Sequence, residues 1–182
     1  MVNVTSQALP YVEKLTKRSL DTIDLIVVHC TELPDLATAR AYGERIQYAS
    51  GTGNSGHFYV DLDGTSYRYV PIDRVAHHTK GFNHRSIGIE LVNRGRYPDW
   101  LNSEHQQLTE PYPSAQIEAL IQLLEQLRQQ LPTLRAIAGH EDLDRTQVAA
   151  SNNPSIQVRR KVDPGPLFPW HSVLAQSQLQ RS

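Results

Sequence analysis

Three residues that could bind one metal ion lie at the ends of short segments of the chain. His29 ends the apolar run 25–29, and His140 follows the apolar run 134–138. Asp163 precedes a proline, which favours an extended backbone at the aspartate. Two imidazoles and one carboxylate, with a fourth position left open, are the ligand set of a catalytic zinc ion. The sequence therefore predicts one catalytic zinc bound by these three residues, and a hydrolytic reaction.

Two further residues could move protons and stabilise charge beside such a metal. Glu90 is a carboxylate within the otherwise apolar run 86–92. Burying a carboxylate there costs free energy and indicates a function, so Glu90 is a candidate general base. Lys161 lies two residues before Asp163, and residues two apart in an extended segment point the same way. Its ammonium could stabilise developing negative charge. The alternatives are that Glu90 pairs with a buried arginine and that Lys161 is a solvated member of the basic run 159–161.

The remaining histidines give weaker signals. His57 begins a predicted hairpin strand, and His78 lies in a loop that precedes the strand of Glu90. We expect both to line the substrate groove as binding residues. The others are expected at the surface or in loops: His77, His84, His105 and His171.

Composition limits the class of protein. The 182 residues, 39% hydrophobic and 20% charged, suit one ordinary globular domain. A formal net charge of -1 gives no reason to expect nucleic acid as a partner, and no run approaches the ~20 apolar residues of a membrane span. The single cysteine, Cys30, excludes an internal disulfide and is expected in the core. Residues 1–20 lack a signal peptide, which predicts a cytoplasmic location; removal of a leader would instead indicate the cell envelope. A monomer is expected because the domain is compact.

Helical and strand patterns alternate along the chain and predict an α/β fold, a single domain with a central mixed β-sheet flanked by helices. The expected helices are residues 6–18, 37–48 and 114–131, and the expected strands are 23–29, 57–62, 65–70, 86–92 and 134–138. An Asp-Gly turn joins the second and third strands into a hairpin. We assign residues 1–22 to an N-terminal extension, 23–175 to the domain and 176–182 to a C-terminal tail.

The segment 142–160, between the second histidine and the aspartate, is expected to be a polar loop. It is long for a connection within a compact domain, and such loops are often functional. It could form a wall of the substrate groove, or it could be a tolerated surface insertion.

Five segments, in this order, resemble the zinc-dependent N-acetylmuramoyl-L-alanine amidases of the type 2 family, which are related to peptidoglycan recognition proteins and phage lysozyme-type amidases. They are residues 27–29, 55–65, 83–91, 139–142 and 161–166, the last being Lys161-Val162-Asp163-Pro164-Gly165-Pro166. The resemblance implies that His29, His140 and Asp163 bind zinc, that Glu90 is the catalytic carboxylate, and that Lys161 stabilises the oxyanion. The implied reaction is hydrolysis of the amide between N-acetylmuramic acid and L-alanine in peptidoglycan or muropeptides.

Two departures from the family pattern bear on mechanism and specificity. Some branches carry a tyrosine just before the hairpin histidine, where this chain has Gly56, and this favours a mechanism through Glu90. The long segment 142–160 replaces a short link, so the sequence does not distinguish intact peptidoglycan from soluble or anhydro-muropeptides. A non-catalytic peptidoglycan-binding module is the alternative function. A zinc peptidase is disfavoured because the chain has no His-Glu-x-x-His motif.

Overall fold

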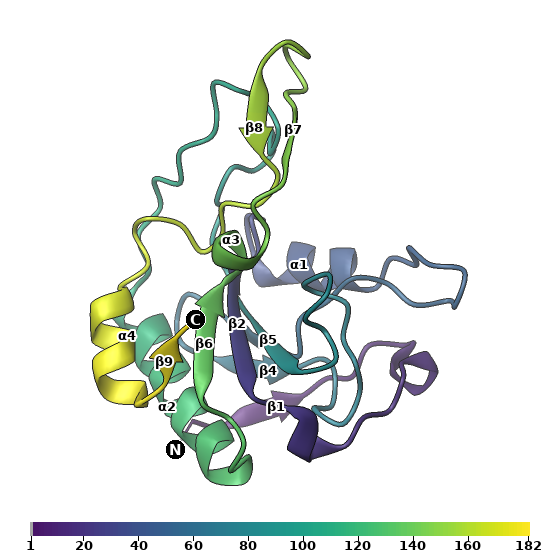
Figure 1. The fold of residues 1–182 in the computed structure, drawn as a ribbon, viewed down its shortest axis with the longest axis vertical. Coiled ribbons are helices and arrows are strands. Elements are labelled where there is room, and N and C mark those ends of the chain that lie inside the picture. Colours follow the sequence, from purple (N-terminus) through teal and green to yellow (C-terminus); the bar gives the residue numbers. More distant parts are fainter. Residues whose placement is uncertain (1) are drawn as a thin grey trace.

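The computed structural model describes residues 2–182, and its central element is a mixed sheet of seven strands in the order β1-β4-β3-β5-β2-β6-β9 (Figure 1). Strand β2 (Leu25–Cys30) lies between β5 (Ser86–Leu91) and β6 (Ala136–Gly139) and is parallel to both. The α/β fold predicted from the sequence is confirmed. The other elements are β1 (Val4–Ser6), η1 (Val12–Lys14), η2 (Leu20–Thr22), α1 (Leu36–Gly43), β3 (Phe58–Val60), β4 (Ser66–Arg68), α2 (Ser114–Gln130), α3 (His140–Leu143), β7 (Gln147–Ala149), β8 (Gln157–Arg159), α4 (Trp170–Ser177) and β9 (Gln180–Arg181).

One face of the sheet is packed against helix α2, with α4 beside that helix (Figure 1). Strand residues alternate between the two faces, so every second residue of β2, β5 and β6 enters this core. The core contains Ile26, Val28, Ile87, Ile89, Ile137, Leu120, Leu124 and Leu127, among others. Helix α2 ends where Leu131 precedes Pro132, which cannot continue the helix.

The opposite face of the sheet carries the residues predicted to do chemistry. His29 lies on this face because its neighbours in the strand, Val28 and Cys30, point to the other face. Cys30 is buried with a free thiol, as the sequence predicted. Strand β3 runs antiparallel to β4 through the Asp-Gly turn, which confirms the predicted hairpin. Helix α1 begins after Asp35, whose carboxylate accepts from the Thr38 amide at 2.7 Å, and it ends at Gly43, five residues earlier than predicted.

The N-terminal segment differs from the sequence prediction. The helix predicted over residues 6–18 is wrong: β1 pairs with β4 in parallel, and only the single turn η1 follows. Pro10 interrupts the predicted helix, because proline has no backbone donor. Leu9, Tyr11 and Leu15 are buried in a second apolar cluster. The predicted extension 1–22 and tail 176–182 each contribute a strand to the sheet, and the domain boundaries stay a prediction.

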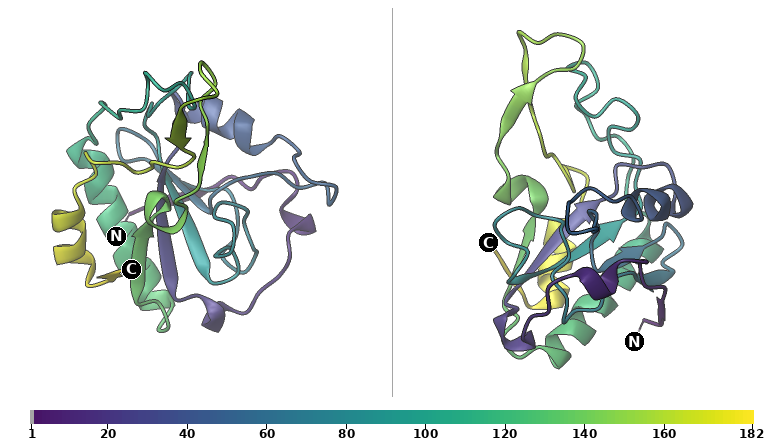
Figure 2. Two further views of the ribbon diagram at one scale, coloured as in Figure 1. Left: turned by 45° about the horizontal axis from the view of Figure 1, so that its top comes forward. Right: turned by 90° about the vertical axis from the view of Figure 1, so that its right-hand side faces the viewer.

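The segment predicted as a polar loop, 142–160, contains an antiparallel hairpin of β7 and β8 that projects from the rest of the molecule (Figures 1 and 2). These strands are three residues each, too short to give a periodic signal in the sequence. The tip is held to the loop 94–106: the Ser151 amide donates to the Leu101 carbonyl at 2.9 Å, and the Asn152 amide group donates to Ser103 Oγ at 3.0 Å. Across residues 2–182, no helix combines the length and apolar character needed to cross a membrane.

Candidate active site

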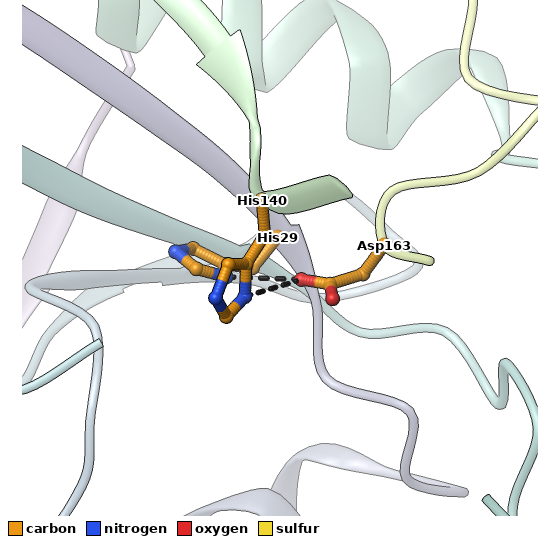
Figure 3. A group of neighbouring side chains, drawn as sticks. All are labelled: His29, His140 and Asp163. Atoms are coloured by element: carbon orange, nitrogen blue, oxygen red, sulfur yellow. Dashed lines mark hydrogen bonds and ion pairs between the residues drawn. The ribbon is translucent and has the colours of Figure 1, made fainter. Parts of the chain in front are cut away.

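The three predicted metal ligands meet at one point of the fold (Figure 3). Asp163 Oδ2 lies 3.0 Å from Nδ1 of His29 and 3.3 Å from Nδ1 of His140. The three potential ligand atoms all lie within 4.8 Å of one another, and all three residues are buried. The structure therefore joins positions that are more than 130 residues apart in the chain into one candidate metal centre.

Sheet topology explains why the two histidines meet. His29 is the fifth residue of β2, and His140 is the first residue of α3, directly after β6. Since β2 and β6 are parallel neighbours, both side chains lie toward the same carboxyl-terminal edge. Asp163 comes from the segment after β8, and its carbonyl accepts a hydrogen bond from the Glu141 amide at 2.9 Å, which ties that segment to α3.

The protonation states and the bonding of these groups suit a bound cation. Burial, reinforced by His140, lowers the pKa of His29 to about 4, so its imidazole is neutral at pH 7 and has a lone pair for a metal. Burial opposes ionisation of Asp163, yet His140, His29 and Lys161 together outweigh it and hold its pKa well below the usual range. Asp163 Oδ1 is buried without a hydrogen-bond partner. A buried carboxylate oxygen left unpaired beside two imidazoles fits a metal ion such as zinc.

A chain of hydrogen bonds assigns the tautomer of His29. Ser86 Oγ donates to the Phe82 carbonyl at 2.8 Å, so the His78 Nε2–H donates to Ser86 Oγ at 3.3 Å. His78 Nδ1 is then an acceptor for the His29 Nε2–H at 3.0 Å. This leaves the His29 Nδ1 lone pair directed toward Asp163 and a metal. His78, predicted as a substrate-binding residue, lines the cleft, but its ring is hydrogen-bonded to His29. A hydrogen bond of this kind to the second ring nitrogen orients metal-binding histidines in many proteins.

His57, also predicted to bind substrate, lies below the cleft and is fully buried. Its Nδ1 accepts from the Gly88 amide at 3.1 Å, and its Nε2 donates to the Arg74 carbonyl at 3.0 Å. Burial and the nearby Arg18 lower its pKa to about 3, so it is neutral. Both ring nitrogens are occupied and the residue does not line the cleft, so the structure gives it no direct contact with a substrate.

Glu90 lies next to the candidate metal centre on the same face of the sheet. In the strand register it is paired with His29 on one side and with Tyr59 on the other. Burial, reinforced by Asp163 and opposed by Lys161, raises the pKa of Glu90 to about 8. A carboxyl group with a raised pKa is suited both to accept and to return a proton near neutral pH. The alternative that Glu90 pairs with a buried arginine finds no support, since no ion pair of Glu90 is present within residues 2–182.

The missing side chain at Gly56 leaves room for Glu90. A Cβ atom at position 56 would lie 2.7 Å from Glu90 Cγ and 3.1 Å from the Gly88 carbonyl oxygen. We therefore predict that Gly56→Ala displaces the Glu90 carboxylate and lowers kcat by about 10- to 100-fold, because small misplacements of a reacting group have effects of this size. Zinc content should stay stoichiometric. Steady-state kinetics and metal analysis would check this, and an unchanged kcat would show that the carboxylate tolerates the displacement.

Lys161 and the candidate metal ligands share one large cleft of about 910 Å³. Glu90 lines the same cleft, and aromatic side chains from Tyr42, Tyr48 and Trp100 form part of its wall. No ion pair engages the Lys161 ammonium in the part of the chain that the structure describes. A volume of this size can hold a ligand of several residues.

The raised pKa of Glu90 predicts how the metal-free protein responds to pH. The folded state keeps the proton up to about pH 8, whereas the unfolded chain loses it near pH 4.5, so this group lowers stability as pH rises between those values. Glu90→Gln should therefore stabilise the metal-free protein above pH 8, by roughly 2 kcal/mol because the open cleft screens part of the effect. It should have no such effect at pH 4. Denaturant unfolding at both pH values checks this; an equal difference at both would contradict it.

Comparison with known proteins agrees with this geometry. Residues 19–166 match the family model described as N-acetylmuramoyl-L-alanine amidase. The chain belongs to this amidase family. It is 38% identical over 94 residues to the amidase AmiD of Escherichia coli K12, covering 52% of this chain and 28% of AmiD. It is 32% identical over 130 residues to the 1,6-anhydro-N-acetylmuramyl-L-alanine amidase AmpD of Enterobacter cloacae, covering 65% of this chain and 56% of AmpD. The chain thus matches about a quarter to just over half of the length of these curated relatives.

Solved structures of amidases share the fold. A complex of E. coli AmiD with the substrate anhydro-N-acetylmuramic acid-L-Ala-D-gamma-Glu-L-Lys superposes with a TM-score of 0.65 at 26% identity, covering 87% of this chain and 58% of the other. The amidase LysC of Clostridium intestinale superposes with a TM-score of 0.68 at 22% identity over 99% of this chain and all of the other. At 22% identity, the likeness to LysC shows a shared fold and nothing more.

Proposed function

We propose that this chain is a zinc amidase that hydrolyses the amide between N-acetylmuramic acid and L-alanine. The observation that carries the proposal is the meeting of His29, His140 and Asp163 within 4.8 Å, next to Glu90. Family membership supports the same reaction. The bound zinc would polarise the scissile carbonyl and lower the pKa of the attacking water.

The residues of the chain divide the remaining work between them. The Glu90 carboxylate accepts a proton from the attacking water while the oxygen of that water bonds to the carbonyl carbon. The Lys161 ammonium donates a hydrogen bond to the oxyanion that develops. Glu90 then returns the proton to the nitrogen of L-alanine as the C–N bond breaks, which releases a lactyl carboxylate and a free stem peptide. A pKa raised to about 8 suits Glu90 to both steps, because a group whose pKa lies near the working pH can accept a proton and return it.

The substrate proposed is a muropeptide or the equivalent unit of peptidoglycan. The AmiD complex with an anhydro-muramyl tripeptide supports this choice. All five proposed site residues come from one chain, which supports action as a monomer. Residues 23–175 are proposed as the catalytic domain. Of the segment 142–160, Arg160 lines the cleft, and the hairpin β7–β8 projects beyond it (Figure 1).

The test compares two substrates with the purified, zinc-loaded protein. Insoluble peptidoglycan and soluble anhydro-N-acetylmuramic acid-L-Ala-D-γ-Glu-L-Lys would be incubated separately, and the products identified by mass spectrometry. We expect a free peptide beginning with L-alanine and a peptide-free sugar. A protein that holds zinc and binds either substrate without cleaving it would instead be a recognition module.

A further inference from the structure

A buried ion pair joins two loops at the side of the cleft. Arg96 Nε lies 2.6 Å from Glu32 Oε1, and Arg96 Nη2 lies 2.8 Å from Glu32 Oε2. The two side chains are 1% and 7% exposed, and both residues line the cleft. Burying such a pair is no more stabilising than burying apolar side chains of the same size, because both charges lose their hydration. Stability alone therefore does not account for it.

The other donors of Arg96 hold the segment that carries Lys161. Its Nη1 donates to the Arg159 carbonyl at 3.0 Å, and its Nη2 donates to the Arg160 carbonyl at 3.2 Å. The Gln106 side-chain oxygen accepts the remaining Nη1–H at 3.0 Å. All five N–H groups of the guanidinium are thus used. Two of them fix the backbone of the residues directly before Lys161.

Glu32 is itself anchored beside the candidate metal centre. It lies three residues after His29, and its backbone has a left-handed φ of 48°. The Trp100 Nε1–H donates to the Glu32 carbonyl at 2.9 Å. Gly95 packs so closely that a Cβ there would lie 2.6 Å from Glu32 Cγ. The carboxylate is therefore held in one position by contacts on several sides.

We propose that Arg96, oriented by Glu32, is a positioning residue that directs the Lys161 ammonium toward the reacting carbonyl. Lysine has a long flexible side chain, so fixing the backbone just before it limits where the ammonium can lie. The connection runs from the end of β2, which bears His29, through Glu32 and Arg96, to Lys161. This inference rests on the proposed function, because it assigns Lys161 a role in the amidase reaction.

The test is a double-mutant cycle in the zinc-loaded, full-length chain. The variants are Arg96→Met, Lys161→Met and the two combined, assayed with anhydro-N-acetylmuramic acid-L-Ala-D-γ-Glu-L-Lys. We expect Arg96→Met alone to lower kcat by about 10- to 100-fold with KM little changed. In the Lys161→Met background the same change should lower kcat less than about threefold, because the group it positions is gone. Equal fold-losses in the two backgrounds would overturn the inference, whereas a wild-type chain that cleaves nothing would instead overturn the proposed function.

Two further variants separate positioning from folding. Arg96→Met leaves the Glu32 charge buried and unpaired, whereas Glu32→Met with Arg96→Met replaces the whole pair by apolar side chains and is expected to fold. This variant should keep the wild-type zinc affinity, measured by chelator competition, and still lose kcat. Arg96→Lys keeps the charge but loses the planar fork that holds the 159 and 160 carbonyls, so its kcat should also fall while its zinc affinity stays at the wild-type value. Wild-type kcat in either variant would refute the positioning role.

Discussion

Glu90→Gln is expected to lower kcat by about 10³-fold, within the range that general acid–base groups contribute. Glutamine keeps the volume and planar shape of the side chain but accepts no proton from the attacking water. The residue is paired in the sheet with His29 and is not itself a candidate ligand, so zinc binding should persist. Steady-state kinetics with a muropeptide, together with metal analysis of the same sample, would check both parts.

A matched change on the surface provides the control for this variant. Glu118 lies on the exposed side of α2, and Glu118→Gln should leave both kcat and zinc content unchanged. A Glu90→Gln protein that retains more than about a tenth of the wild-type turnover would exclude the residue as the base.

Lys161→Met should lower kcat by about 10²- to 10³-fold, the effect of removing one donor to a developing oxyanion. The loss should appear in kcat rather than in KM, since the interaction is made with the transition state. Methionine keeps most of the length of the side chain, and the zinc content should not change. Stopped assays of peptide release at several substrate concentrations would separate the two constants.

The comparison that controls for charge is Lys17→Met, at an exposed position, which should have wild-type kinetics. If Lys161→Met instead raised KM and left kcat intact, the ammonium would bind the ground state of the substrate, and its assignment to the oxyanion would be wrong.

The sequence predicts the fold class and the residues of the candidate centre because both follow from local signals. His29 and His140 end apolar runs, and Glu90 is a carboxylate inside one, so their positions at the carboxyl-terminal part of a sheet could be inferred. The parallel pairing of β2 with β5 and β6 then brings them together. Such pairing follows from general rules of α/β folds.

Features that depend on distant contacts could not be predicted. The pairing of β1 with β4 joins Val4 to Ser66, which lie far apart in the chain, so no local signal could indicate it. The hydrogen bond between His78 and His29 joins residues 49 positions apart, and the full burial of His57 depends on tertiary packing. The pair of Glu32 and Arg96 spans 64 residues without any motif to indicate it.

Removal and return of the metal tests the central claim most directly. The protein would be stripped with a chelator and incubated with anhydro-N-acetylmuramic acid-L-Ala-D-γ-Glu-L-Lys before and after addition of one equivalent of zinc. We predict no cleavage without metal, and with zinc the release of the tripeptide from the lactyl group. Cleavage by the metal-free protein at the same rate, or cleavage at another bond of the substrate, would contradict a zinc amidase built on His29, His140 and Asp163.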